Sequence, residues 1–155
     1  MRLFIRDAQP ADADTISELA FRSKGYWQYP ADAMELWRDE LCLDPADINN
    51  PTHRVAIAII DDEIVGYSHL VEIEPGVGEL DGLFVDPTFI GKGVGKALLQ
   101  DVLESARVRT LDVLHVESDP NAEQFYARAG GIPNGVRESD KIAGRFLPLF
   151  QFQLK

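Results

Sequence analysis

The residues that most clearly suggest chemistry form a glycine-rich turn in mid-chain, Ile90-Gly-Lys-Gly-Val-Gly-Lys96. Glycines allow a backbone to adopt positive φ and to approach a ligand closely. The apolar spacing that follows predicts a helix from about Gly93 to Arg107, whose N-terminus would offer unpaired N–H groups and partial positive charge. With two lysines beside it, the turn predicts a phosphate-binding site, the alternative being a turn that merely lets helix and sheet pack closely.

Two common phosphate-binding motifs do not fit this turn. A nucleoside-triphosphate P-loop needs G-x-x-x-x-G-K-[ST], but the spacing from Gly91 to Gly95 is one residue short and Ala97 stands in place of the hydroxyl residue. A dinucleotide-binding G-x-G-x-x-G fingerprint also fails, because Lys96 follows Gly95 and the third glycine is misplaced. The phosphate ligand therefore belongs to another class.

Two carboxylates precede this turn on a predicted strand. Glu79, Asp81 and Leu83 alternate, so they are expected on one face of the strand. Two acids on one face suit the wall of an active cleft, and the alternative is that both are solvated strand residues. Cys42 is a poor nucleophile candidate, since no histidine lies near it in sequence to activate it.

The sequence predicts strands and helices that alternate along the chain and position these residues. Strands are expected at 2–6, 55–60, 63–73, 78–85, 111–117 and 150–154, with helices opening at Pro10, Pro30 and Gly93 and another running from Ser118-Asp119-Pro120 to Gly130. The second helix should present Met34, Trp37 and Leu41 on one face. The strands at 55–85 should form an antiparallel meander. The pattern predicts an α/β fold with a mixed central sheet and helices on both faces, forming one domain over residues 1–155.

Composition limits the partners. The chain of 155 residues carries a formal net charge of −11, which disfavours nucleic acid and acidic membranes as ligands. No apolar run reaches the ~20 residues of a membrane span, and no secretory signal is evident, so we expect a cytoplasmic protein. With one cysteine and no Cys/His cluster in the sequence, no metal is expected. His53, His69 and His115 are interpreted as separate structural histidines.

Taken together, these motifs resemble the GNAT superfamily of acyl-CoA-dependent N-acetyltransferases. The turn is similar to that family's [QR]-x-x-G-x-[GA] pyrophosphate loop, with Ile90 in place of the usual Gln or Arg. Gly82-Leu-Phe-Val-Asp-Pro87 resembles its fourth strand, and Asp119-Pro-Asn-Ala-Glu-Gln-Phe-Tyr-Ala-Arg-Ala-Gly130 resembles its late P-N-A-x-x-F-Y segment. The likeness covers nearly the whole chain in the right element order.

The resemblance implies acetyl-CoA as co-substrate and roles for particular residues. Glu79 would be the general base, with Asp81 as the alternative, and Tyr126 the acid that protonates the departing thiolate. The backbone N–H near Leu83 would polarise the thioester carbonyl. Cofactor contacts fall on Leu83, Phe84, Val85, Ile90, Gly91, Lys92, Gly93, Val94, Gly95, Lys96 and Asn121, although Asn121 could instead cap its helix. The acceptor pocket would involve Tyr26, Trp27, Tyr29 and Arg145, which could equally be packing or surface residues.

The expected activity is direct transfer of an acetyl group from acetyl-CoA to an amine, either a small molecule or a protein amine. A non-catalytic acyl-CoA sensor on the same fold is the alternative, and retention of both Glu79 and Tyr126 argues against it. A nucleotide-binding regulatory domain is disfavoured by the glycine spacing. Dimers are common in such folds, so a homodimer is compatible with the sequence, but no residue pattern specifies an interface.

Overall fold

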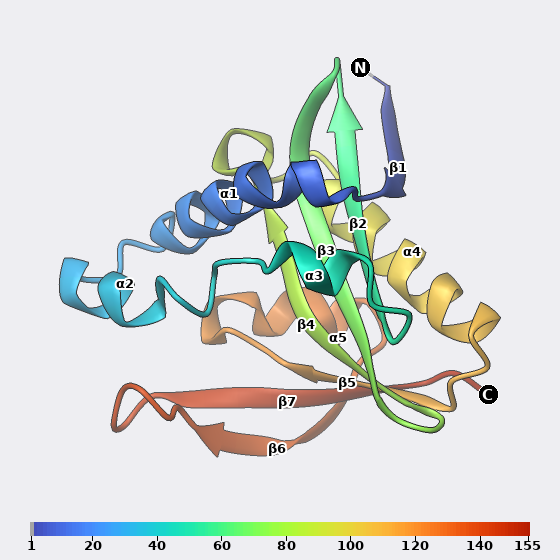
Figure 1. Cartoon of the computed structure of the whole chain (residues 1–155). Helices are drawn as coiled ribbons and strands as arrows, with labels where there is room; N and C mark the ends of the chain where they lie inside the picture. Colours follow the sequence, from blue (N-terminus) through green and yellow to red (C-terminus); the bar gives the residue numbers. More distant parts are fainter. Residues whose placement is uncertain (1) are drawn as a thin grey trace.

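The computed structural model describes residues 2–155 and alternates strands with helices (Figure 1). Its strands are β1 (Leu3–Asp7), β2 (His53–Ile60), β3 (Glu63–Glu74), β4 (Val77–Val85), β5 (Val113–Glu117), β6 (Ile132–Glu138) and β7 (Phe146–Gln153). Its helices are α1 (Ala13–Gly25), α2 (Ala31–Trp37), α3 (Pro45–Ile48), α4 (Val94–Val108) and α5 (Glu123–Arg128), with short 3-10 turns at Pro10–Asp12, Pro87–Phe89 and Pro120–Ala122. No helix in the described part of the chain is long and apolar enough to cross a membrane.

All seven strands form one sheet in the order β1-β2-β3-β4-β5-β7-β6. The β2-β3-β4 segment is the antiparallel meander that the sequence predicts, and only the β4–β5 pair is parallel. The parallel pair needs a crossover, and α4 supplies it by packing against β3 and β4 on its way to β5. The mixed sheet is thereby confirmed.

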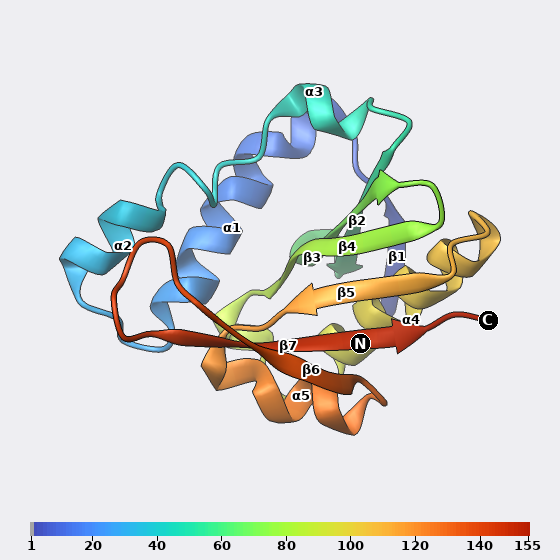
Figure 2. The same ribbon diagram turned by 90° about the horizontal axis from the view of Figure 1, so that it is seen from below.

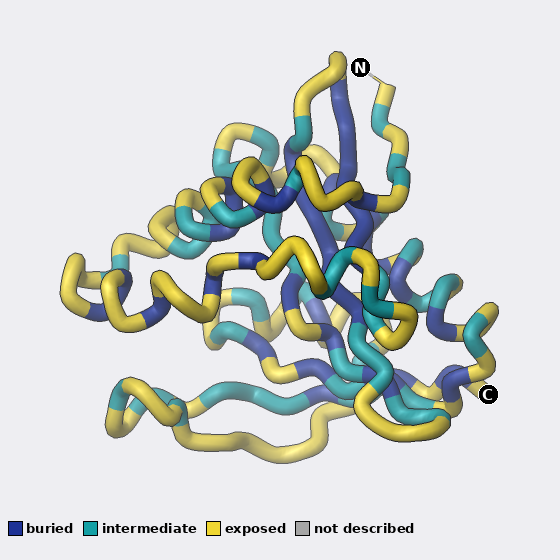
Figure 3. The backbone as a smooth tube through the Cα atoms, in the orientation of Figure 1, coloured by how far each residue is buried: buried dark blue, intermediate teal, exposed yellow. Residues whose placement is uncertain are grey.

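Helices cover both faces of the sheet, as Figure 2 shows from below. One face is covered by α1, α2 and α3, where Ile16 and Leu19 of α1 pack against Ile57 of β2. The other face is covered by α4 and α5, with Leu99 and Val102 of α4 at its centre. Burying these apolar stripes on both sides of the sheet drives the layered arrangement. Figure 3 shows the buried residues concentrated along β2, β3 and the inner faces of the helices.

The parallel pair separates soon after it forms. β4 and β5 pair from Val77 opposite Val113 to Leu80 opposite Val116, and no later residue of β4 has a β5 partner. At that point the β3–β4 register shifts, because His69 pairs with Gly82 and Leu70 pairs with Leu80, which leaves Asp81 as the extra residue of a bulge. A bulge bends its strand, so β4 turns away from β5 and opens a cleft at this level.

Three local expectations need correction or extension. The second helix ends at Trp37, so Leu41 is buried from a following turn rather than from the helix itself. The short α3 and the strand β6 were not expected. All seven residues of β6 are exposed at the edge of the sheet, and Pro133 and Gly135 within it mask the usual strand pattern.

Candidate active site

A cavity of about 560 Å³ lies where β4 and β5 diverge. Among the residues proposed from sequence, Glu79, Asp81, Leu83, Phe84 and Tyr126 all line it. The structure therefore brings together the strand carboxylates and the late tyrosine, which are more than forty residues apart in the chain. The bounds of the cavity extend to α2 and to the loop between β6 and β7.

The bulge at Asp81 changes which way the β4 side chains point. Glu79 is paired with Val71, and Leu83 with Ser68, so the extra residue between them puts Leu83 on the opposite face. The prediction that Glu79, Asp81 and Leu83 share one face is therefore wrong for Leu83. Its side chain packs in the clusters under α4, so only its backbone can serve the cavity.

The two carboxylates differ in environment. Glu79 is half-buried, whereas the Asp81 side chain is 57% exposed. Desolvation raises the pKa of Glu79, and the negative charges of Asp81 and Glu117 raise it further. A carboxylate with a raised pKa is a better proton acceptor than an ordinary one.

Tyr126 lies in α5 and is almost fully buried, with a relative exposure of 7%. Its ring meets Phe125 edge-on and lies 6.0 Å from the ring of Phe150. Burial raises the pKa of its hydroxyl, and the charge of Asp119 adds to the effect, so the phenol keeps its proton. It can therefore donate a proton but not act as a base.

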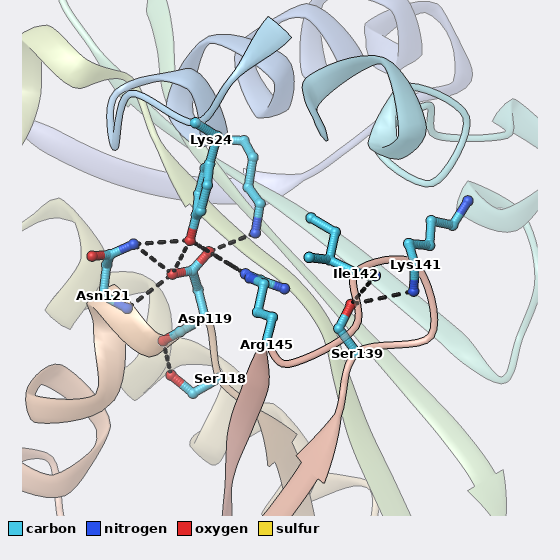
Figure 4. Close-up of polar contacts among 9 residues, drawn as sticks. Lys24, Ser118, Asp119, Asn121, Ser139, Lys141, Ile142 and Arg145 are labelled. Atoms are coloured by element: carbon cyan, nitrogen blue, oxygen red, sulfur yellow. Dashed lines mark hydrogen bonds and ion pairs between the residues drawn. The ribbon is translucent and has the colours of Figure 1, made fainter. Parts of the chain in front are cut away.

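An ion cluster closes one end of the cavity (Figure 4). At its centre, Asp119 accepts from Lys24 Nζ at 2.5 Å and from Arg145 at 3.1 Å. Tyr29 Oη donates to the same carboxylate at 2.9 Å and accepts from the Asn121 side chain at 2.9 Å. The cluster joins the end of α1, the loop before α2, the turn after β5 and the start of β7.

The cluster is nearly sealed from water. The side chains of Lys24, Asp119 and Arg145 are 13–17% exposed, and both cations lie over the Trp37 ring, at 4.4 and 4.8 Å from its centroid. Burial by itself would raise the pKa of Asp119, but the ion pair with Lys24 and the hydrogen bonds outweigh it and lower that pKa. Asp119 is therefore charged, and it balances two buried cations.

The aromatic residues proposed for the acceptor pocket separate into two groups. Tyr29 and Arg145 belong to the ion cluster, and Arg145 lines the cavity. Tyr26 and Trp27 pack edge-on against each other and are 46% and 42% exposed, away from the cavity lining. The structure therefore does not bring Tyr26 and Trp27 to the site.

The glycine turn lies at the start of α4, and none of its residues lines the cavity. Gly91 and Gly93 have φ of +82° and +84°, and Gly93 is the N-cap of the helix. A Cβ at either glycine would meet nothing within 4 Å, so the concave side of the turn is open. A Cβ at Gly95 would lie 3.4 Å from Phe125, an ordinary van der Waals distance, so packing does not require glycine there. Gly91 and Gly93 fit an anion cradle.

The cavity carries an excess of negative charge. It is lined by eight Asp and Glu residues against four Lys and Arg residues. Within the described residues, each of the four cations contacts a carboxylate, whereas four of the acids have no Lys or Arg partner: Asp44, Asp47, Glu79 and Asp81. A cavity of this sign attracts positively charged ligands.

Sequence reasoning missed two features of the site. Lys24 was unremarkable as one lysine in a helix, because nothing in the sequence pairs it with a residue 95 positions away. His53 and His69 were interpreted separately, yet their rings are in contact. Counting outward from the Asp61-Asp62 turn puts His53 opposite Leu70, on the other face of the sheet from His69, so the sequence gives no signal of this contact.

Comparison with known proteins identifies the family. A model described as the acetyltransferase (GNAT) family matches residues 14–131. The chain is 31% identical over 154 residues to aminoglycoside N(6′)-acetyltransferase type 1 of Stenotrophomonas maltophilia, covering 94% of this chain and 93% of that protein. The chain belongs to the GNAT acetyltransferase family.

Solved structures share the fold. The PaiA N-acetyltransferase of Thermoplasma acidophilum, solved in complex with coenzyme A, superimposes with a TM-score of 0.79 at 20% identity, with 99% of each chain covered. An aminoglycoside 6′-N-acetyltransferase complexed with coenzyme A gives a TM-score of 0.75 at 15% identity, covering 98% of this chain and 97% of that one.

The ion cluster yields a stability prediction. Asp119→Asn keeps the shape and one acceptor oxygen but removes the charge, so two buried cations lose their partner and unfolding should become easier by about 3 kcal/mol at pH 7. Because the folded-state pKa of Asp119 is lowered, its stabilising effect is present above the unfolded pKa of ~3.9 and is lost as pH falls through the folded value.

Denaturant unfolding of both proteins between pH 7 and pH 3 measures this effect. The gap between wild type and Asp119→Asn should narrow toward pH 3. Glu35→Gln is the matched control, because it removes an exposed ion pair with Arg38 and should leave stability nearly unchanged. An equal loss from both variants would show that burial of the cluster contributes nothing.

Proposed function

We propose that residues 1–155 act as one N-acetyltransferase domain that moves an acetyl group from acetyl-CoA directly to an amine. The observation that carries this proposal is the cavity between the diverging β4 and β5, which is lined by Glu79 and Tyr126, together with the open glycine turn at the start of α4. Family membership and the coenzyme A complexes of the fold relatives support it.

The glycine turn and the free side of β4 are proposed to hold acetyl-CoA. The pyrophosphate would lie against Gly91 and Gly93, where positive φ and the start of α4 direct N–H groups outward and Lys92 adds charge. Ile90, Val94, Gly95 and Lys96 complete the proposed loop contacts. The pantothenyl arm would run along Leu83, Phe84 and Val85, whose side facing β5 has no strand partner. Asn121, bonded to Tyr29 and Asp119 in this structure, is the proposed contact on the opposite wall.

The proposed chemistry needs three proton transfers. The acceptor ammonium gives a proton to the Glu79 carboxylate through water, and the free nitrogen forms a C–N bond to the acetyl carbon. The C–S bond breaks as the same nitrogen loses its second proton to solvent, and the departing thiolate takes the proton of the Tyr126 hydroxyl, which solvent later replaces. The backbone N–H near Leu83 would stabilise the charge that develops on the carbonyl oxygen. Asp81 is the alternative base.

The acceptor is proposed to carry more than one positive charge. Four carboxylates without a Lys or Arg partner line the cavity, and a cation with several amines can neutralise several of them while presenting one amine to Glu79. The name of the relative from Stenotrophomonas maltophilia, an aminoglycoside acetyltransferase, points to an acceptor of the same charge type.

The cofactor site is tested by Gly93→Ala. A methyl group here would meet the phosphate and disturb a charged hydrogen bond worth about 1.5–3 kcal/mol, so acetyl-CoA affinity should fall roughly tenfold or more. Gly135→Ala is the matched control, since Gly135 also has positive φ (+94°) and open space but lies on the edge strand β6. Calorimetry should show weaker acetyl-CoA binding only for Gly93→Ala. If both variants lose the same affinity, backbone strain explains the loss and the phosphate contact at Gly93 is refuted.

Variants of the proposed base and of the proposed acid should differ in how their activity depends on pH. Wild-type kcat/KM should fall as pH drops through the raised pKa of Glu79, because the protonated carboxyl cannot accept a proton. Glu79→Gln should lose turnover at neutral pH and recover partly at high pH, as amines of pKa ~10.4 shed their own protons.

Tyr126→Phe should instead lose about 100-fold in kcat at every pH, with acetyl-CoA affinity unchanged. If Glu79→Gln stays fully active while Asp81→Asn is dead, the two carboxylates exchange roles. If all three variants keep wild-type activity at every pH, catalysis comes from positioning of the reactants alone.

The function itself is tested by thiol release from acetyl-CoA with amines of different charge. Spermidine and kanamycin A should give KM values at least roughly tenfold below that of propylamine, and 0.5 M salt should raise the KM of the polycations most, because it screens charge over distances of about 4 Å or more. Tight acetyl-CoA binding without thiol release for any amine would support a sensor instead.

A further inference from the structure

Two histidines and an aspartate converge at the far side of the cavity from the ion cluster. Nδ1 of His53 lies 2.8 Å from Nε2 of His69, and the ligand atoms of both histidines and Asp47 all lie within 4.8 Å of one another. His69 is buried, while His53 and Asp47 are partly buried at the surface. The proposed acetyl transfer assigns no role to either histidine, and Asp47 enters it only as one of the carboxylates proposed to attract the acceptor.

The two rings meet because of a second bulge. The β2–β3 register shifts between Ala58 and Ile59, so His53 pairs with Val71 and Val55 pairs with His69. Without that shift His53 would lie opposite Leu70, on the other face of the sheet from His69. The bulge therefore puts both imidazoles on one face, two residues apart along adjacent strands.

The elements that present the three side chains are held firmly. Asp44 caps α3 by accepting from the Ala46 N–H, which fixes the turn of helix that carries Asp47. The His53 carbonyl accepts from Arg109, and the His53 N–H donates to the Asn50 carbonyl at 2.9 Å. A braced backbone lowers the cost of ordering ligands around an ion.

The surroundings of His69 suit metal ligation. Nδ1 of His69 faces Asp81 Oδ2 at 3.5 Å. A proton on Nδ1, directed at that carboxylate, leaves the lone pair on Nε2, which points toward His53. A carboxylate behind a histidine is the usual outer partner of a metal-ligating imidazole.

We propose that Asp47, His53 and His69 form a binding site for a divalent transition-metal ion, with Zn²⁺ favoured and Asp81 orienting His69. Imidazole and carboxylate together suit zinc, whose ligand bonds of about 2.0–2.1 Å place neighbouring tetrahedral ligands about 3.3 Å apart. The imidazole nitrogens need to separate by only about half an ångström to reach that spacing. Water or a fourth group completes the shell. The ion would link α3 and the start of β2 to β3.

Zinc titration of the full-length, chelator-treated protein tests the site. Calorimetry should show one equivalent of Zn²⁺, and Co²⁺ should produce the visible absorption bands of a tetrahedral site. Asp47→Asn and His53→Gln should each weaken Zn²⁺ binding at least roughly tenfold, and Asp81→Asn by about 10–100-fold, the range of outer-partner losses. Zn²⁺ should also raise the melting temperature of the wild type but not of these variants.

Two matched variants separate this site from other zinc ligands. His115→Gln removes the histidine on β5, and Cys42→Ser removes the single thiol, which is exposed. Both should bind Zn²⁺ as tightly as the wild type. Loss of binding in Cys42→Ser alone, or wild-type affinity no greater than that of His53→Gln, would overturn the proposal and leave the histidines as a hydrogen-bonded pair. His69→Gln changes a buried residue and could disturb the fold. The test therefore uses Asp47→Asn and His53→Gln, whose circular dichroism should match that of the wild type.

Discussion

The separation of β4 from β5 is the constraint on which the site depends. The two parallel strands pair over four residues and then part, because the bulge at Asp81 bends β4 while β5 ends before Pro120. Backbone N–H and C=O groups of β4, which would pair with β5 in a continuous sheet, are therefore left facing a cavity. The same bulge turns Leu83 into the α4 core and leaves Glu79 facing the cavity, so one extra residue sets both the width of the cleft and the chemistry of its wall.

The opposite wall is held by electrostatics rather than by a strand ladder. Asp119 follows β5 directly and draws Lys24 from α1 and Arg145 from the start of β7 onto one carboxylate. Because all three groups are nearly out of water, each depends on the others to offset its desolvation. Trp37 lies beneath both cations and ties α2 to the same point. Four of the other acidic residues described above have no Lys or Arg partner, so the cavity attracts ligands of positive charge.

Sequence reasoning reached the mixed sheet, the meander and α4 because each has a strong local signal: alternation, a two-residue turn, or apolar residues at helical spacing. Glu79, Asp81 and Tyr126, which it assigned to the site, line one cavity, and their roles stay predictions. It failed where register decides the outcome. A glycine lies beside each bulge, Gly82 after Asp81 and Gly66 opposite Ala58, but a glycine within a strand is only a weak sign of an inserted residue. The face of Leu83 and the contact of His53 with His69 were therefore not predictable. Long-range ion pairs such as Lys24 with Asp119 leave no periodic signal at all. Strand β6 was hidden by Pro133 and Gly135.

Those two residues have a consequence for how the protein behaves among copies of itself. An edge strand whose seven residues are all exposed is a template onto which another chain can add by main-chain hydrogen bonding. Pro133 supplies no N–H to such a neighbour, the register shift between Pro133 and Val136 breaks the flat ladder, and Arg137 and Glu138 place charge beside it. The irregularities that make β6 hard to recognise in the sequence thus also disfavour the addition of another chain at this edge of the sheet.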